Sequence, residues 1–134
     1  MGRVVFHGKA GCLTNRRQVA ALRAAHVEVE VHDLLLTTWR KEDLWAYFKG
    51  LDQREWVNPR AAAVKSGSFK PEETNARALL SALVGDPILI RRPLLVIEGV
   101  RLVGFDQKRL EGLLGVCLDM TGEDDCSRLR GAVS

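Results

Sequence analysis

The sequence has no apolar run of the roughly 18 residues that a membrane-spanning helix requires. Its first residues also lack the long apolar stretch and small-residue cleavage site of a signal peptide. We therefore expect a cytoplasmic protein with no membrane partner. Basic residues are not concentrated either, since 20 lysines and arginines are dispersed among 17 acidic residues for a net charge of +3. Nucleic-acid binding favours a concentrated basic surface, so no nucleic-acid partner is expected.

Cysteines are few, and only Cys12, Cys117 and Cys126 are present. An odd number at wide, irregular spacing fits neither a disulfide framework nor a zinc ligand set, so no metal site is expected. Cys117 falls on the apolar face of a helix expected from 106 to about 118, which favours a core position. Cys126 falls in a polar stretch, where it is either an unpaired thiol or a thiol that resolves a disulfide formed at Cys12.

At 134 residues and 46% hydrophobic composition, the chain is long enough for one well-packed domain and too short for two. A β-branched run at 3–7 predicts a strand, and 27–32 alternates apolar and polar residues as a half-buried strand does. A helix expected at 12–25 joins the two, so these strands should be parallel. A second helix is expected near 40–49, followed by short helical turns over 52–70.

The last third predicts a helix that begins at Pro71 and ends at Gly85, then a hairpin and a final helix. The hairpin strands are 94–97 and 100–103, joined by the two-residue turn 98–99. The order β-α-β, helices, β-β-α predicts an α/β, thioredoxin-like fold, with a mixed sheet of about four strands flanked by helices. We expect this domain to cover 1–120, with an all-helical insertion at about 38–86, and 121–134 to be a flexible tail.

The start of the first helix is the candidate site. A thiol reacts as its thiolate, which the unpaired N–H groups and the dipole at a helix N-terminus favour, and Cys12 is expected there. Asn15 and Arg16 can add donors and charge for an anion, and His7 would favour the thiolate if protonated and nearby. The plainer alternative is that Cys12 is a small buried residue beside an ordinary turn.

Two segments carry a family resemblance. Residues 6–16, Phe-His-Gly-Lys-Ala-Gly-Cys-Leu-Thr-Asn-Arg, resemble the segment around the nucleophilic cysteine of glutaredoxin-dependent arsenate reductases. Residues 86–96, Asp-Pro-Ile-Leu-Ile-Arg-Arg-Pro-Leu-Leu-Val, resemble the same family's Pro-Ile-Leu-Ile-x-Arg-Pro segment. The Gly-Cys-x-x-Asn-x-Arg-Gln stretch at 11–18 is most similar to a branch described as nitrogenase-associated proteins.

The resemblance implies Cys12 as nucleophile, Arg92 as an oxyanion-binding residue and Pro93 as the proline that faces the cysteine. It also implies three arginines around the oxyanion. The matching middle position holds Val64, with Arg60 close by, and the position after the hairpin holds Gly104.

The leading hypothesis is a thiol-dependent redox protein in which Cys12 attacks an oxidised substrate, assisted by Arg92 and Arg16. Glutathione or a glutaredoxin would act as reductant, with no bound cofactor. Because the arginine set differs from the family pattern, one alternative is a non-catalytic module that binds a protein of the nitrogenase system. A genuine arsenate reductase is a further alternative.

Overall fold

The computed structural model describes residues 3–120, whose strands form one mixed sheet in the order β2-β1-β3-β4. Strand β1 (Arg3–Gly8) pairs in parallel with β2 (Glu28–Asp33) and antiparallel with β3 (Leu94–Ile97). Strand β4 (Val100–Val103) completes the hairpin with β3. The predicted thioredoxin-like α/β fold is confirmed, whereas the tail expected at 121–134, with Cys126, lies outside the described residues.

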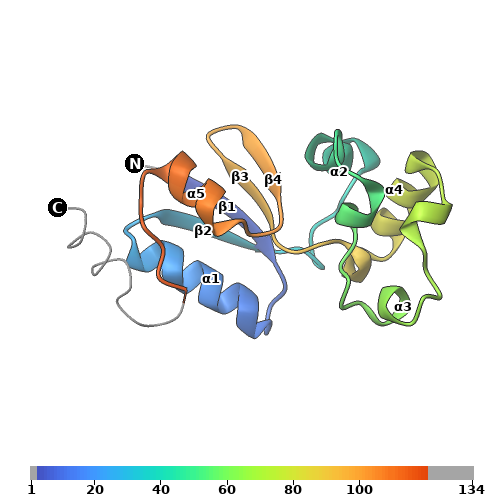
Figure 1. Cartoon of the computed structure of the whole chain (residues 1–134), viewed down its shortest axis with the longest axis horizontal. Helices are drawn as coiled ribbons and strands as arrows, with labels where there is room; N and C mark the ends of the chain where they lie inside the picture. The colour runs from blue at the N-terminus through green and yellow to red at the C-terminus, as the bar shows by residue number, and fades with distance from the viewer. Residues whose placement is uncertain (1–2, 121–134) are drawn as a thin grey trace.

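Helices α1 (Leu13–Ala24) and α5 (Gln107–Leu114) lie beside the sheet, and α1 follows directly from the loop after β1 (Figure 1). Alternation along β1 and β3 turns one set of apolar side chains toward these helices. The resulting cluster consists of apolar residues that are at most 7% exposed: Val4, Phe6, Leu22, Val27, Leu95, Ile97, Leu102, Leu110 and Leu118. This core fixes α1, and hence its first residue, against the end of β1.

Between β2 and β3 the chain is helical and gathers at one end of the molecule (Figure 1). The segment expected over 38–86 corresponds to helices that run from Lys41 to Leu89. The longer elements are α2 (Lys41–Phe48), α3 (Ala62–Lys65) and α4 (Ala76–Gly85), and the short 3-10 turns are η1 (Gln53–Trp56), η2 (Pro71–Glu73) and η3 (Pro87–Leu89). Their apolar side chains form a second cluster that includes Leu94 of β3, so the helical segment and the sheet share one packed boundary.

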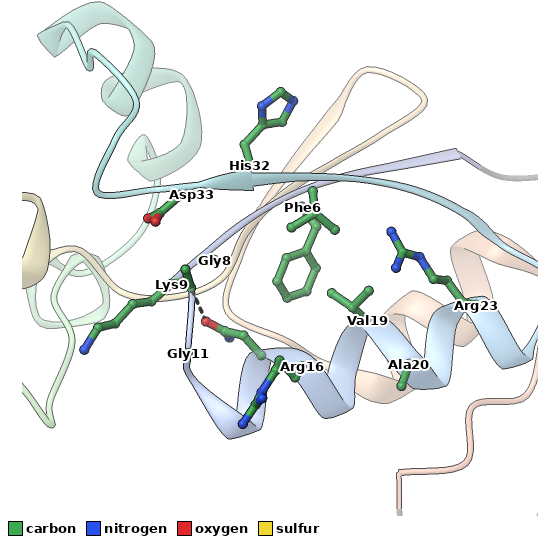
Figure 2. A pocket seen from close by; sticks show the side chains of 13 residues that line it. Phe6, Gly8, Lys9, Gly11, Arg16, Val19, Ala20, Arg23, His32 and Asp33 are labelled. Carbon is green, nitrogen blue, oxygen red and sulfur yellow. Dashed lines mark hydrogen bonds between the residues drawn. The ribbon is translucent and has the colours of Figure 1, made fainter.

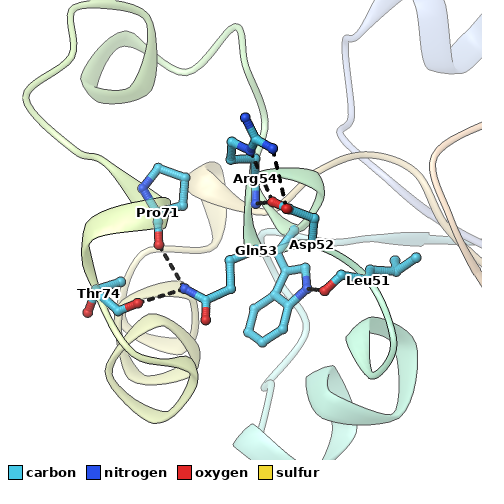
Figure 3. Close-up of polar contacts among 7 residues, drawn as sticks. Leu51, Asp52, Gln53, Arg54, Pro71 and Thr74 are labelled. Carbon is cyan, nitrogen blue, oxygen red and sulfur yellow. Dashed lines mark hydrogen bonds and ion pairs between the residues drawn. The ribbon is translucent and has the colours of Figure 1, made fainter.

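Hydrogen bonds from Gln53 connect the turns η1 and η2 of this segment (Figure 3). The Nε2 atom of Gln53 donates to the carbonyl oxygens of Pro71 at 2.8 Å and Thr74 at 2.7 Å. Beside it, the Asp52 carboxylate accepts from the backbone N–H of Arg54, and the indole of Trp56 donates to the carbonyl of Leu51. The two Gln53 hydrogen bonds join η1 to η2 and Thr74 across about twenty residues of chain.

The helix expected to begin at Pro71 begins later. Pro71 opens only the short turn η2, and the extended backbone of Thr74 (φ −125°, ψ 162°) separates this turn from α4. Asn75 then caps α4, because its side chain accepts from the N–H of Ala78 at 2.8 Å. The expectation failed because Asn75, four residues after Pro71, competes with the proline as a helix start.

The final helix is also shorter than predicted. It ends at Leu114, where Gly115 adopts a left-handed conformation (φ 67°) and its N–H bonds to the carbonyl of Glu111. The chain then folds back, since the N–H of Leu118 donates to the Glu111 carboxylate at 2.7 Å. Cys117 is therefore a half-buried residue beyond the helix, not a core residue on its inner face.

Within residues 3–120, no helix combines the length and the apolar character that a membrane crossing would require.

Candidate functional site

Cys12 occupies the N-cap position of α1, as predicted, and its thiol is free and half-buried. Its N–H donates to the carbonyl of Lys9 at 3.1 Å, and its own carbonyl accepts from the N–H of Arg16 at 3.0 Å. The Cys12 side chain makes no capping hydrogen bond, and the first turn carries no acidic residue. The N–H groups of that turn therefore remain available to a negative charge at the helix start.

Asn15 holds the loop that presents the thiol. Its Oδ1 accepts from the backbone N–H of Lys9 at 2.9 Å, and its Nδ2 donates to Oε1 of Gln18 at 3.0 Å. Gly8 permits this approach, because a Cβ placed there would lie 2.6 Å from the Phe6 ring and 3.0 Å from Oδ1 of Asn15. The side chain expected to contribute donors to a ligand thus fixes the shape of the loop.

The Arg92–Pro93 peptide bond is cis, and Pro93, predicted to face the cysteine, does not line the cavity that Cys12 lines, so this placement stays a prediction. Pro93 is buried, and its carbonyl accepts from the N–H of Gly104 at 2.8 Å. Arg92 and Cys12 line one cavity of about 190 Å³, which we call the Cys12 cavity. Its lining comprises a thiol, a hydroxyl, a proline, three amides and three guanidinium groups: Cys12, Thr14, Asn15, Gln18, Asn58, Pro59, Arg60, Arg91 and Arg92.

Backbone pairing between distant segments brings Asn58 and Arg60 to this cavity. An isolated antiparallel bridge joins Val57 to Ile90, flanked by hydrogen bonds from the N–H of Asn58 to Leu89 and from the N–H of Arg91 to Trp56. This short ladder sets the helical segment against the approach to β3. As a result, residues 58–60 and 91–92 face the same space as Cys12.

Arg91 lines the Cys12 cavity, and its guanidinium lies close to Gly104. A Cβ placed on Gly104 would lie 3.1 Å from Nε of Arg91 and 3.7 Å from its Cζ. Gly104 also has a left-handed backbone (φ 79°), which an L side chain rarely adopts. The missing side chain at 104 thus leaves room for the guanidinium of Arg91.

Within residues 3–120, the positive charges of the Cys12 cavity are not balanced by carboxylates. No carboxylate lines it, and no ion pair found within the described residues involves Arg60, Arg91 or Arg92. The Nη1 atom of Arg92 is buried without a hydrogen-bond acceptor. Because buried donors are normally satisfied, this atom indicates a place for an acceptor that comes from outside the chain.

Arg16 points to a different part of the surface. It lines a larger, mainly apolar groove of about 350 Å³ between α1 and β2, with Lys9 and Arg23. Figure 2 shows Phe6 and Val19 in the space between the helix and the strand. Arg16 does not line the Cys12 cavity, so its predicted role beside the thiol remains a prediction without geometric support.

His7 lies in an aromatic environment that disfavours its protonated form. Its ring stacks on His32 at 5.1 Å and meets Trp39 edge-on at 5.0 Å, and it does not line the Cys12 cavity. Burial, with a smaller contribution from His32, lowers the pKa of His7 from 6.5 to about 4. The imidazole is therefore neutral at physiological pH, which does not favour the predicted support of a thiolate by protonated His7, and that role stays a prediction.

The sequence did not single out Gln18, Asn58 or Arg91 as site residues, and it placed Arg60 only near a matching position. Val64, which occupies that position, lies in α3 and does not line the cavity. The adjacent pair Arg91-Arg92 was the one signal that could have drawn attention to Arg91. Among residues 3–120, no group of three or more histidine, cysteine or acidic side chains is placed to hold a metal ion.

Comparisons with known proteins agree with this architecture. The structure superposes on an arsenate reductase from Vibrio cholerae with a TM-score of 0.67 and 24% identity, covering 85% of this chain and 97% of that one. It superposes on an ArsC-family-related protein from Bacteroides fragilis with a TM-score of 0.71 and 24% identity, covering 82% and 96%. At this identity, the likeness shows the fold alone.

A relative found by sequence shares more identical residues with this chain than these two structures do. A 15.7 kDa protein from the draG 3′ region of Rhodospirillum rubrum is 36% identical over 123 residues, which cover 92% of this chain and 86% of that protein. The sequence model of the ArsC family matches residues 10–113, a span that contains Cys12, the helical segment and Arg92. The chain therefore belongs to the ArsC family.

Proposed function

We propose that this protein is a thiol-dependent oxidoreductase, in which Cys12 is the nucleophile and Arg92 binds an anionic group of the oxidised substrate. The observation that carries the proposal is that Arg92 lines the same cavity as the free Cys12 thiol, while its buried Nη1 atom has no hydrogen-bond acceptor. A charge-assisted hydrogen bond from this atom would hold a substrate anion beside the helix start.

The reaction balances as two thiol–disulfide exchanges. The Cys12 thiolate attacks one sulfur of an anionic disulfide, a Cys12 mixed disulfide forms, and the second sulfur leaves as a thiolate with the electron pair of the broken bond. Glutathione or a glutaredoxin then supplies a thiolate that attacks the mixed disulfide and frees Cys12. The half-buried position of the Cys12 thiol is compatible with both attacks.

The biological setting is part of the same proposal. The Gly-Cys-x-x-Asn-x-Arg-Gln segment resembles nitrogenase-associated proteins, and the Rhodospirillum rubrum relative is named for the draG region. Both support a substrate or partner protein in the nitrogen-fixation system.

The test compares two disulfides in the wild-type protein and in Arg92→Met, which keeps much of the side-chain length and removes the charge. We expect Arg92→Met to slow mixed-disulfide formation at Cys12 with oxidised glutathione by about tenfold or more, because a hydrogen bond to a charged group is lost. The rate with neutral hydroxyethyl disulfide should change little. Arg23→Met, which removes a cation from the α1–β2 groove, serves as the control.

Equal slowing with both disulfides, or no modification of Cys12 by either, would contradict the proposal. A Cys12→Ser strain with unchanged nitrogen fixation would favour a non-catalytic binding module. Steady turnover of arsenate with glutathione and glutaredoxin would identify an arsenate reductase.

A further inference from the structure

A second cationic cavity lies next to the Cys12 cavity. It has a volume of about 250 Å³ and is formed by the end of α2, strand β4 and the start of α5. Its charged lining consists of Lys49, Arg101, Arg109 and a single carboxylate, Asp106. We call it the Lys49 cavity.

The cations of this cavity are not neutralised within the part of the chain that the structure describes. Among the described residues, Lys49, Arg101 and Arg109 take part in no ion pair. The Asp106 carboxylate is already engaged, since its Oδ1 accepts from the backbone N–H of Arg109 at 3.2 Å as the cap of α5. The guanidinium of Arg101 is held over the Tyr47 ring, 5.8 Å from its centroid. The cavity therefore offers three unpaired positive charges to an anion, of which Arg101 is held against an aromatic ring.

The two cavities meet at Gly104 and Arg91. Gly104 lines the Lys49 cavity, Arg91 lines the Cys12 cavity, and the Arg91 guanidinium lies against the Cα of Gly104. One cationic side chain is thus the boundary between the space beside the thiol and the space beside Lys49. Because the two cavities meet at this side chain, a ligand with two ends, such as an extended tripeptide about 10 Å long, suits them.

We infer that the Lys49 cavity binds the carboxylates of a small anionic thiol, such as a peptide thiol, whose sulfur attacks the Cys12 mixed disulfide. This inference rests on the proposed function and names a subsite for its reductant. Lys49 and Arg109 bind the carboxylate end of this ligand. Its thiol end extends past Arg91, at the boundary of the two cavities, toward Cys12. In the attack, the thiolate forms a new S–S bond to the Cys12 sulfur, and the previous partner leaves as a thiolate with the bonding pair.

The test starts from the full-length protein with thionitrobenzoate attached to Cys12. Three thiols then release thionitrobenzoate: glutathione with its two carboxylates, glutathione diethyl ester with none, and neutral 2-mercaptoethanol. The trace of the Cys12→Ser protein is subtracted, so that only release from Cys12 is counted. In the wild type, we expect glutathione to react faster than its diester once both rates are expressed per thiolate.

The variant is Lys49→Ala/Arg109→Ala, and the control is Lys65→Ala/Arg77→Ala, which removes two exposed cations that line none of the described cavities. Removing two exposed charge contacts should slow glutathione about fivefold and leave 2-mercaptoethanol unchanged. Equal effects on the two thiols, an equal effect of the control, or a diester as fast as glutathione would overturn the inference. Failure of thionitrobenzoate to label Cys12 would instead contradict the proposed function.

Discussion

Replacing Gly104 with alanine tests whether the space above this glycine positions Arg91. The new Cβ would lie 3.5 Å from Nη2 of Arg91, an ordinary contact, but only 3.1 Å from Nε, which is tighter than nine in ten Cβ contacts. The guanidinium must therefore shift by a few tenths of an ångström. The backbone at 104 is also left-handed (φ 79°), so alanine adds strain of about 1–2 kcal/mol that is independent of Arg91.

Gly99 separates these two effects. It has nearly the same backbone conformation (φ 81°), but a Cβ there would meet no atom within 4 Å. Gly104→Ala and Gly99→Ala should therefore lower the free energy of unfolding by similar amounts, measured by urea denaturation. Only Gly104→Ala should disturb the Cys12 cavity.

The assay is protection of Cys12 from iodoacetamide by sulfate, an inert divalent anion. Displacing Arg91 weakens one charge-assisted hydrogen bond without removing it, so we expect the protecting sulfate concentration to rise about two- to fivefold in Gly104→Ala. Arg91→Met should raise it further, and Gly99→Ala should leave it unchanged. Equal protection in Gly104→Ala and Gly99→Ala would refute the role assigned to Arg91.

Three further substitutions test individual contacts of the fold. Gln53→Ala should cost about 1–2 kcal/mol in chemical denaturation, because two backbone acceptors lose their donor, whereas Arg54→Ala at the exposed ion pair beside it should cost almost nothing. Gly8→Ala should cost about 1–3 kcal/mol through the clash with Phe6, and a wild-type melting temperature would argue against that contact. Since folded His7 stays neutral down to about pH 4 while the unfolded chain protonates it near 6.5, unfolding free energy should fall as the pH drops through this window. The ring is only half-buried, so we expect His7→Phe to reduce this loss by about 1–2 kcal/mol, and parallel pH–stability curves for the two proteins would contradict it.

The sheet could be predicted from the sequence because its signals are local. Strand β2 shows its two-residue alternation directly, and the hairpin turn contains Glu98 and Gly99, both of which adopt positive φ angles (50° and 81°). A two-residue turn with this geometry is what Glu-Gly between two apolar runs indicates. The end of α5 could not be predicted in the same way, because the return of Leu118 to Glu111 is a contact between a backbone and a side chain seven residues apart.

The site was predictable only in part, for a related reason. Cys12 and Arg92 stand in recognisable local segments, but Arg60 reaches the cavity through the pairing of Val57 with Ile90, 33 residues later in the chain. No periodicity within one segment reports such a pairing. The neutral state of His7 was equally hidden, since its cause is burial against Trp39 and His32 in the folded protein.

The positive charges around Cys12 affect both the stability of the fold and the binding of an anion. Arg60 and Arg92 belong to segments held together by the Val57–Ile90 bridge, whereas the thiol belongs to a loop held by Asn15. Bringing unpaired guanidinium groups into one cavity is unfavourable through mutual repulsion, so the fold must supply that energy from the two packed clusters. Binding an anion relieves the repulsion and joins the two segments across the cavity. Ligand binding should therefore stabilise the chain at the boundary between the helical segment and the sheet, where hydrogen exchange of the Asn58 and Arg91 amides would report it.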